Sequence, residues 1–182
     1  MTIYELWTDG SCFPNPGGPG GWAFRLIRRQ PLQVDEVLLE GSGPLACSTT
    51  NQAELLAAIN GLQQTMAQHP EIRRLLVCSD SAYVVNCFRD RWYRKWAERG
   101  WMNAANKPVE NSDLWKVLLD LNQQPTVDVR WEHVRGHSGL EHNERVDHLA
   151  GQQRLQAQKM RDGDPRVIGE VFRSMHDATP IR

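Results

Sequence analysis

The sequence predicts an α/β fold in which a three-stranded meander is followed by alternating helices and strands. Two observations lead to this class. Three stretches of β-type alternation follow one another across short loops within residues 3–41, which favours antiparallel pairing. Beyond residue 48, stretches with helical spacing alternate with short apolar runs, which is typical of parallel strands joined by crossover helices.

The composition fits one globular domain. The chain has 182 residues, of which 40% are hydrophobic and 24% are charged. The net charge is −1, so binding to nucleic acid would require a local basic patch. The four cysteines form no C-x-x-C pair, which predicts a reducing, cytoplasmic setting. The chain has no run of ~18 apolar residues and no charged-then-apolar start, so we expect no membrane span and no leader.

The first predicted strand, residues 3–8, ends at an acidic residue. Asp9 is followed by a loop rich in glycine and proline, residues 12–21, which cannot be regular structure. Asp9 could open this turn, or its carboxylate could face a cleft that the neighbouring glycines leave uncrowded. The second and third strands are predicted at residues 21–28 and 33–41.

Helices and strands alternate in the central part of the chain. A helix opens near residues 48–54, and a buried strand follows at residues 72–78. A second helix follows Ser81, and a third follows residues 111–113, which would cap it. The core stripe of the first helix consists of Leu55, Ile59, Leu62 and Met66.

The C-terminal part is predicted to hold a fifth strand, a loop and a long helix. The strand covers residues 127–132, the loop covers residues 135–139 and contains two glycines, and the helix covers residues 143–160. From Asp162 onward the periodicity is weak, which indicates a tail with at most one short helix, near residues 167–175.

Four acidic residues occupy comparable places in these elements. Asp9 and Asp80 end predicted strands, Glu54 lies in the first turn of the first helix, and Asp147 lies on the last helix. Each has an ordinary structural explanation. Glu54 and Asn51 fit a capping box, Asp80 could cap the helix that follows it, and Asp147 could be a solvated helix charge.

A metal site is the alternative explanation for these carboxylates. Glu54 shares its helix face with Ala57, Ala58 and Gly61, and a face of small residues would let the helix approach the sheet near the strand tips. Clustered carboxylates repel one another unless a cation lies between them. Mg²⁺ prefers oxygen ligands, and two ions about 3.5–4 Å apart could clamp the attacking and the leaving oxygen of a phosphodiester.

Residues 88–107 form a basic segment with interleaved tryptophans. Six basic and two acidic residues give the segment a charge of +4. It could be a solvated helix over packed tryptophans or a surface that binds phosphate. The phosphate-binding side chains would be Arg91, Arg94, Lys95 and Arg99. Trp92 and Trp96 lie one helical turn apart and could brace the segment.

Five motifs, in order and spread over residues 1–155, resemble bacterial type 1 ribonuclease H. They are Thr8-Asp9-Gly10-Ser11-Cys12, Asn15-Pro16-Gly17, Thr49-Thr50-Asn51-x-x-Glu54, Asp80-Ser81-x-Tyr83-Val84, and Gly136-His137-Ser138-Gly139 with Asn143-Glu144-x-x-Asp147. One such motif is weak, whereas five in order are highly specific. The resemblance implies a five-stranded mixed sheet, three antiparallel strands and then two parallel ones, flanked by helices. It also implies a catalytic domain over residues 1–158, with a basic protrusion at 88–107, and a C-terminal tail over 159–182.

The resemblance further implies an endonuclease that hydrolyses the RNA strand of RNA–DNA hybrids. Such an enzyme would act as a cytoplasmic monomer with two Mg²⁺ ions, which Mn²⁺ could replace, and would leave 5′-phosphate and 3′-hydroxyl ends. Asp9, Glu54, Asp80 and Asp147 would bind metal and catalyse, with His137 and Glu144 as auxiliaries. The substrate-binding residues would be Cys12, Asn15, Thr49, Asn51, Arg91, Trp92, Arg94, Lys95, Trp96 and Arg99.

His137 has two explanations from the residues alone. It could be an ordinary loop histidine. Because Gly136 and Gly139 would let its loop move, and because histidine titrates near neutral pH, it could instead transfer protons or assist product release. We expect this second role rather than metal ligation.

Two departures and three rival functions accompany this prediction. Thr50 stands where asparagine is common and Ala82 where glutamine is common, both beside substrate contacts, which bears on affinity and cleavage preference. A hybrid-binding module without catalysis would be expected to lack one of the four acids. Another nuclease or resolvase on the same fold would lack the basic segment together with the last motif, and a purely structural domain would need no acid at each position.

Overall fold

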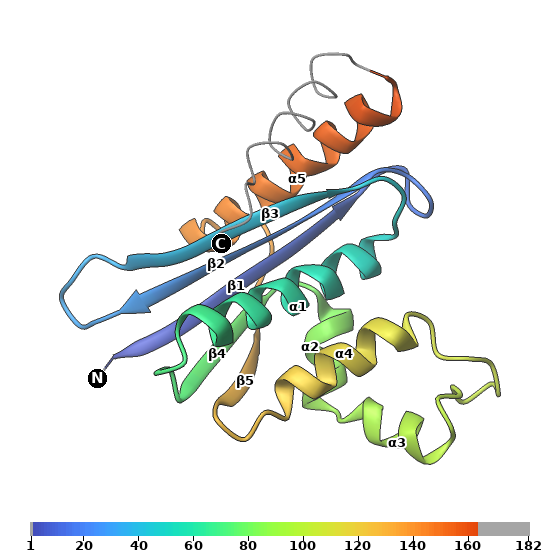
Figure 1. Cartoon of the computed structure of the whole chain (residues 1–182), viewed down its shortest axis with the longest axis horizontal. Coiled ribbons are helices and arrows are strands. Elements are labelled where there is room, and N and C mark those ends of the chain that lie inside the picture. The colour runs from blue at the N-terminus through green and yellow to red at the C-terminus, as the bar shows by residue number, and fades with distance from the viewer. Residues whose placement is uncertain (1, 164–182) are drawn as a thin grey trace, which may run out of the picture.

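The sheet has five strands of mixed direction, as the sequence predicted. The computed structural model describes residues 2–163, and its strands lie in the order β3-β2-β1-β4-β5 (Figure 1). The first three strands pair antiparallel, whereas β4 pairs in parallel with both β1 and β5. The strands are β1 (Ile3–Cys12), β2 (Gly20–Arg29), β3 (Glu36–Leu45), β4 (Arg74–Ser79) and β5 (Asp128–His133).

Helices cover both faces of the sheet. Alternation along β1 sends Leu6 into a core shared with α1, α2 and α4, and sends Trp7 into a smaller core under α5. Figure 1 shows α1 and α5 on opposite sides of the sheet. The helices of the described residues are α1 (Thr50–Gln68), α2 (Ala82–Arg89), α3 (Trp92–Glu98), α4 (Ser112–Asn122) and α5 (Glu141–Arg161).

Small residues bring α1 unusually close to the sheet. A Cβ atom added to Gly61 would lie 3.1 Å from the methyl groups of Leu6, and Ala57 and Ala58 are buried beside it. The contact at Gly10 of β1 is tighter, because a Cβ there would lie 2.3 Å from the backbone nitrogen of Glu54. The predicted approach of this helix face to the sheet is therefore confirmed, and it places Glu54 against β1.

The third strand lies further along the chain than predicted. Residues 31–34 form the hairpin turn, with Leu32 in the left-handed region at φ 62°, so β3 begins only at Glu36. It runs past Gly41, its predicted end, and past Gly43 to Leu45. A Cβ on either glycine would lie 2.6–2.7 Å from the ring of its cross-strand neighbour on β2, Phe24 or Trp22, so these glycines make room for aromatic rings within the sheet.

Helix starts differ in detail from the prediction. Asn111 occupies the N-cap position of α4 at φ 56°, but its side chain makes no capping bond to the described residues, so the predicted side-chain cap is wrong. α5 begins at Glu141, two residues earlier than expected. The short helix predicted near residues 167–175 lies outside the described residues. Within residues 2–163, no helix is both long and apolar enough to cross a membrane.

Candidate active site

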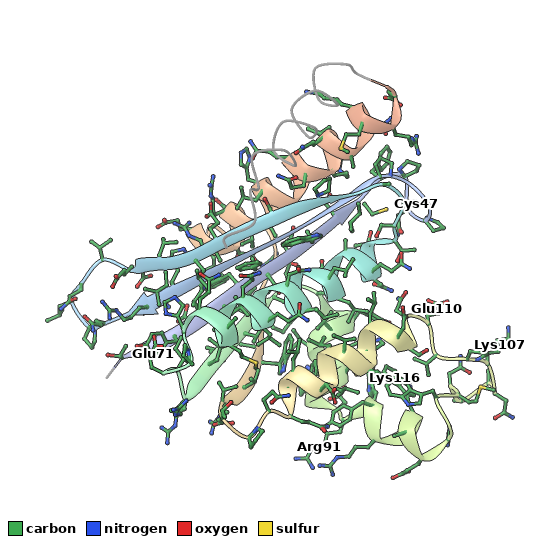
Figure 2. All side chains as sticks on the ribbon, viewed as in Figure 1. Cys47, Glu71, Arg91, Lys107, Glu110 and Lys116 are labelled. Atoms are coloured by element: carbon green, nitrogen blue, oxygen red, sulfur yellow. The ribbon has the colours of Figure 1, made fainter. Side chains whose placement is uncertain are left out.

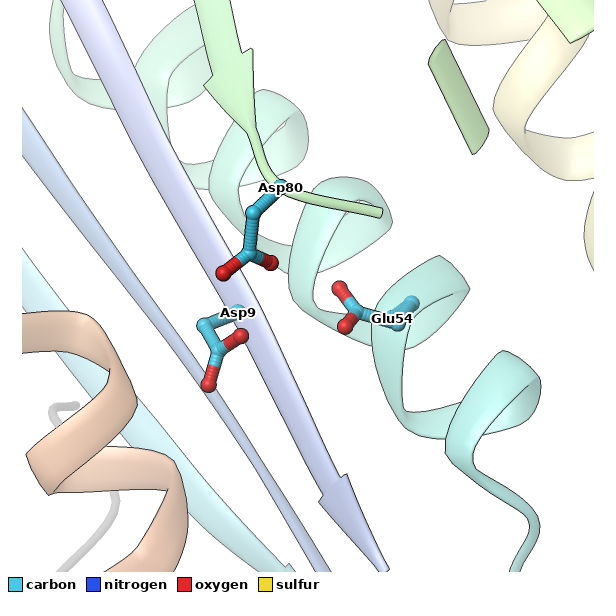
Figure 3. Close-up of side chains that lie close together, drawn as sticks. All are labelled: Asp9, Glu54 and Asp80. Atoms are coloured by element: carbon cyan, nitrogen blue, oxygen red, sulfur yellow. The ribbon is translucent and has the colours of Figure 1, made fainter. Parts of the chain in front are cut away.

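Three carboxylates from three elements meet at one edge of the central strands. Asp9 lies on β1, Asp80 directly follows the parallel neighbour β4, and Glu54 lies on α1 (Figure 3). One oxygen from each side chain lies within 4.8 Å of the other two. The structure therefore brings together three of the four predicted acids, and the close contact at Gly10 is what lets Glu54 reach the other two.

The capping roles considered for Glu54 and Asp80 are wrong. α1 is capped by Thr49, whose hydroxyl accepts from the Gln52 nitrogen at 3.1 Å, and the Gln52 side chain accepts from the Thr49 nitrogen at 3.0 Å. Glu54 therefore has no part in the capping box. The N-cap of α2 is Ser81, and no side-chain capping bond to the described residues is present there, so the Asp80 carboxylate is also free of that role.

Burial and mutual repulsion make the cluster unfavourable without a cation. Asp9 and Glu54 are each only 6% exposed. Burial, followed by the charges of Asp80 and Asp147, raises the pKa of Asp9 to about 8. Burial, followed by the charge of Asp9, raises the pKa of Glu54 well above its usual range. Oε2 of Glu54 is buried and has no hydrogen-bond partner among the described residues.

These features fit a site for hard divalent cations. Unpaired, buried carboxylate oxygens are the ligands that Mg²⁺ and Mn²⁺ accept, and a cation would replace the missing partner of Glu54. Buried like charges at this separation are otherwise hard to explain, because their repulsion and desolvation both disfavour folding. Asp9, Glu54 and Asp80 could hold such an ion.

Asp147 and His137 lie beside the cluster rather than within it. Asp147 is on α5, close enough for its charge to raise the pKa values of Asp9 and Glu54. Nδ1 of His137 lies 3.9 Å from Oδ2 of Asp147, and the His137 side chain is 83% exposed. The Gly139 nitrogen donates to Glu144 at 3.0 Å, which ties the loop that carries His137 to the first turn of α5.

Two side chains outside the predicted set contact Asp80. Asn143 is 2% exposed, and its Nδ2 donates to Oδ2 of Asp80 at 3.4 Å. Nε2 of His133, the last residue of β5, lies 3.1 Å from the backbone oxygen of Asp80. Asn143 stands inside a motif of the resemblance, which is a signal that could have found it. His133 pairs in register with Ser79, and this becomes visible only once the β4–β5 register is known.

Two loops next to the cluster are bound to each other. The Gly17 nitrogen donates to the Ser48 oxygen at 2.8 Å, and the Ser48 nitrogen donates to the Gly18 oxygen at 2.9 Å. The Thr50 nitrogen donates to Asn15 at 3.1 Å, and Sγ of Cys12 lies 3.3 Å from the Ser48 oxygen. The predicted substrate-binding residues of the two loops, Cys12, Asn15, Thr49 and Asn51, therefore come from adjoining segments.

The basic segment places its charges outward and its tryptophans inward. The predicted basic residues of α3 and its flanks are exposed, and Figure 2 shows Arg91 on the outer side of this segment. The rings of Trp92 and Trp96 are half-buried, with centroids 6.4 Å apart, and Trp96 meets Trp115 of α4 edge-on at 5.6 Å. The two tryptophans therefore brace the segment against the core. Their contact with substrate stays a prediction.

Fold and site together define a class of metal-dependent hydrolases of phosphodiester bonds. β1 continues past the predicted end to Cys12, so Asp9 lies within the strand, two residues beyond the part that pairs with β4. This carboxylate, the one that follows β4 and a third acid on a helix suit this chemistry. The chain belongs to the RNase H family, because the family model described as RNase H matches residues 1–154. It is thus a ribonuclease H, a hydrolase and an endonuclease.

Similar proteins cover most of the chain. A "Ribonuclease H" of Thermus thermophilus is 44% identical over 162 residues, which are 89% of each chain. "Ribonuclease H" of Granulibacter bethesdensis is 42% identical over 154 residues, which are 85% of this chain and 93% of the relative. Among solved structures, LC9-RNase H1, described as a type 1 RNase H with the type 2 active-site motif, has a TM-score of 0.65 at 28% identity and covers 84% of this chain and 74% of its own.

Proposed function

We propose that this protein hydrolyses the RNA strand of RNA–DNA hybrids with two Mg²⁺ ions, leaving 5′-phosphate and 3′-hydroxyl ends. The observation that carries the proposal is the group of buried Asp9 and Glu54 with half-buried Asp80, whose repulsion calls for cations. Membership of the RNase H family supports the substrate. So does the shared fold of LC11-RNase H1, described in complex with RNA/DNA hybrid, at a TM-score of 0.59 and 18% identity.

Each acid has a proposed task. Asp9, Glu54, Asp80 and Asp147 would hold the ions, and Mn²⁺ could take the place of Mg²⁺. Ions bound there would supply an activated water and positive charge at the leaving 3′-oxygen. His137 would receive or deliver a proton beside Asp147, or assist release of the product. Glu144 would act as an auxiliary that keeps the His137 loop in reach through its bond to Gly139.

Substrate recognition is assigned to two surfaces. The joined loops would hold a phosphate of the DNA strand through Asn15 and Thr49, with Cys12 beside them, and Asn51 would contact the hybrid near the scissile step. The basic segment would bind the backbone through the exposed residues Arg91, Arg94, Lys95 and Arg99, with Trp92 and Trp96 supporting them. Selectivity for RNA requires contacts to 2′-hydroxyl groups.

The remaining assignments concern the whole chain. We infer a catalytic domain over residues 1–158 and a tail over residues 159–182, with α5 itself continuing to Arg161. We further infer a monomer in the cytoplasm. The four cysteines are free thiols in the described part of the chain, and two of them are buried, which suits a reducing compartment.

The test compares four labelled substrates with and without Mg²⁺: RNA–DNA hybrid, duplex RNA, duplex DNA and single-stranded RNA. We expect Mg²⁺-dependent cleavage of the hybrid only, with the label on 5′-phosphate products. Cleavage of duplex DNA would instead support a resolvase. Tight binding of the hybrid without cleavage would support a binding module, and either result would overturn the proposal.

A further inference from the structure

A polar network with buried ends and a partly exposed middle, Arg29 and Asp35, lies under the first turn of α5. Its members, here called the anchor network, are Glu5, Trp7, Arg29, Asp35 and His142. Glu5 accepts from Nε1 of Trp7 at 3.0 Å and from Arg29 at 2.6 Å. Arg29 also donates to Asp35 at 2.8 Å, and Asp35 lies 3.1 Å from Nε2 of His142. Glu5 is 4% exposed and His142 is 6% exposed, so both ends of the network are out of water.

The anchor network continues directly into the acidic cluster. Glu5, Trp7 and Asp9 alternate along β1 and therefore project from the same face of the sheet. The ring of His142 packs 5.8 Å from the ring of Trp7. His142 immediately precedes Asn143, which donates to Asp80. The network thus joins the sheet face that carries Asp9 to the helical turn that approaches Asp80.

The network attaches the start of α5 to the sheet through hydrogen bonds, and this helix start lacks a side-chain cap among the described residues. The N-cap of α5 is Leu140, and no side-chain capping bond to the described residues is present there. The apolar contacts of α5 come from later residues, Val146, Leu149 and Ala150. A helix end without a cap frays readily. The bond between Asp35 and His142 therefore helps to fix the first turn against the sheet, beside the contact of Asn143 with Asp80 and the bond of Arg145 to Glu40 of β3.

Stability alone is a weak reason for such a network. Buried charged groups are costly to desolvate, and apolar residues of similar volume are often as stabilising. Directional bonds, in contrast, fix the position of the element that carries them. Displacing a reacting group by about 1 Å can lower a rate about 10²-fold, so precise placement of this turn matters next to an active site.

We propose that Asp35 and His142 are positioning residues for the cleavage reaction, although neither touches the cluster. Their bond helps to fix the first turn of α5. That turn in turn sets Asn143 against Asp80 and starts the helix that carries Asp147. This inference rests on the proposed function for its kinetic consequence, while the structural consequence stands by itself.

The test replaces His142 with leucine and with glutamine. Leucine fills similar space but cannot bond to Asp35, whereas the amide of glutamine can donate from about the position of Nε2. We expect His142→Leu to lower kcat about 10- to 100-fold with KM changed less than about 3-fold. We expect His142→Gln to restore most of the loss. Titration calorimetry should show weaker Mg²⁺ binding for His142→Leu and near-normal binding for His142→Gln.

A destabilised control separates positioning from general loss of packing. Leu149→Ala removes apolar contact from the same helix, in the core that also contains Trp7, but removes no hydrogen bond of the anchor network. It should lower the melting temperature at least as much as His142→Leu and leave kcat within about 3-fold of wild type. The proposal is overturned if the two variants lose kcat equally, or if His142→Leu keeps wild-type kcat.

Hydrogen–deuterium exchange tests the anchor without any reaction. In His142→Leu, peptides covering residues 141–149 should exchange faster, whereas peptides from the far end of α5 should not change. Unchanged exchange in the first turns would overturn the anchoring role even if activity fell. If wild-type protein failed to cleave hybrids, the proposed function would be lost while this measurement still decided the structural part.

Discussion

At the scale of single residues, the main feature is that Asp9 and Glu54 are buried close to other acids. Burial and repulsion raise the pKa of Asp9 to about 8. In the folded protein the carboxyl therefore stays protonated up to about pH 8, whereas in the unfolded chain it loses its proton near its ordinary pKa of 3.8. Stability from this group is therefore present at low pH and falls as pH rises from about 4 to about 8. The metal-free protein should lose stability over this range.

Asp9→Asn tests two effects of this carboxylate, metal binding and the loss of stability in the metal-free protein. The variant should be inactive on hybrids because it removes a metal ligand. It should also melt at a higher temperature than wild type in EDTA, and the difference should grow from pH 5 to pH 8 because asparagine cannot ionise. Saturating Mg²⁺ should narrow the difference by stabilising only the wild type. Melting curves at several pH values check this, and wild-type turnover in Asp9→Asn would remove the cluster from the mechanism.

Asp80→Asn gives an independent check at a different element. Its carboxylate raises the pKa of Asp9, so neutralising it should lower that pKa and also stabilise the metal-free protein. Activity should be lost while the fold remains. A variant that keeps its circular dichroism spectrum but cleaves at the wild-type rate would contradict the proposed role of Asp80.

His137→Ala should behave differently from the acid variants. Its ring reaches toward Asp147 at 3.9 Å and is otherwise open to solvent, which suits proton transfer rather than metal ligation. General acid–base assistance is typically worth about 10²–10⁴-fold, so kcat should fall by that order and leave residual activity. KM and the Mg²⁺ dependence should change little. Loss as complete as in Asp9→Asn, or weaker Mg²⁺ binding by calorimetry, would exclude this role.

At the scale of elements, the basic segment around α3 offers a quantitative prediction. Its arginines and Lys95 are exposed, while the tryptophans beneath them hold the segment in place. Each phosphate contact that is lost should lower the slope of log affinity against log salt by about 0.9 on a B-like duplex. The variant replaces Arg91, Arg94, Lys95 and Arg99 with glutamine. Its hybrid binding should weaken and its salt slope should flatten, with kcat at saturating substrate little changed.

Arginines at the other end of the sheet provide the control for that variant. Arg74 and Arg130 are exposed near the starts of β4 and β5, away from Asp80, which follows the end of β4. Replacing both with glutamine removes two charges but no proposed phosphate contact. Binding measured over a salt series should give the wild-type slope. Equal slopes for wild type and the four-residue variant would make the segment a structural element only.

Elements that depend on local pattern could be predicted, whereas long-range contacts could not. The five strands and the order of helices follow from alternation, helical spacing and short loops. The sequence predicts too early an end for β3 because Gly41 resembles a turn residue until the ring of Phe24 on the neighbouring strand is placed over it. The cap of α1 was misassigned because Thr49 and Asn51 offer equally plausible starts to a helix two residues apart.

In the site too, local patterns could be predicted from the sequence and long-range contacts could not. The three acids that meet, Asp9, Glu54 and Asp80, could be found because the sequence places them at predicted strand ends, on a helix beside small residues and within ordered motifs, although β1 continues past Asp9 to Cys12. The contact of His133 with Asp80 depends on the register of two parallel strands. The bond between Asp35 and His142 joins residues 107 positions apart, so no local spacing signals it. Such partners become visible only when the hairpin and α5 are placed on the sheet.

At the scale of the whole molecule, the cluster lies where the two packed layers meet. α1 brings Glu54 from one face of the sheet, β1 and the residue after β4 supply Asp9 and Asp80, and α5 on the other face places Asp147 beside them. The site therefore requires both cores to be formed. Partial unfolding of either layer should abolish Mg²⁺ binding before global unfolding is complete.

Truncation after Met160 tests the proposed domain boundary. The deletion removes the last residue of α5, Arg161, and also Asp162, whose carboxylate accepts from the Gln158 amide at 2.7 and 2.8 Å. This bond is exposed, so its loss should cost little stability. The residues assigned to metal and substrate all precede the cut. Hybrid cleavage by the truncated protein should therefore stay within about 3-fold of wild type, because changes away from a site usually have small effects. The measurement is kcat and KM on labelled hybrid, with circular dichroism as the control for folding. A truncated protein that folds but cannot cleave would mean that the tail belongs to the site or supports it.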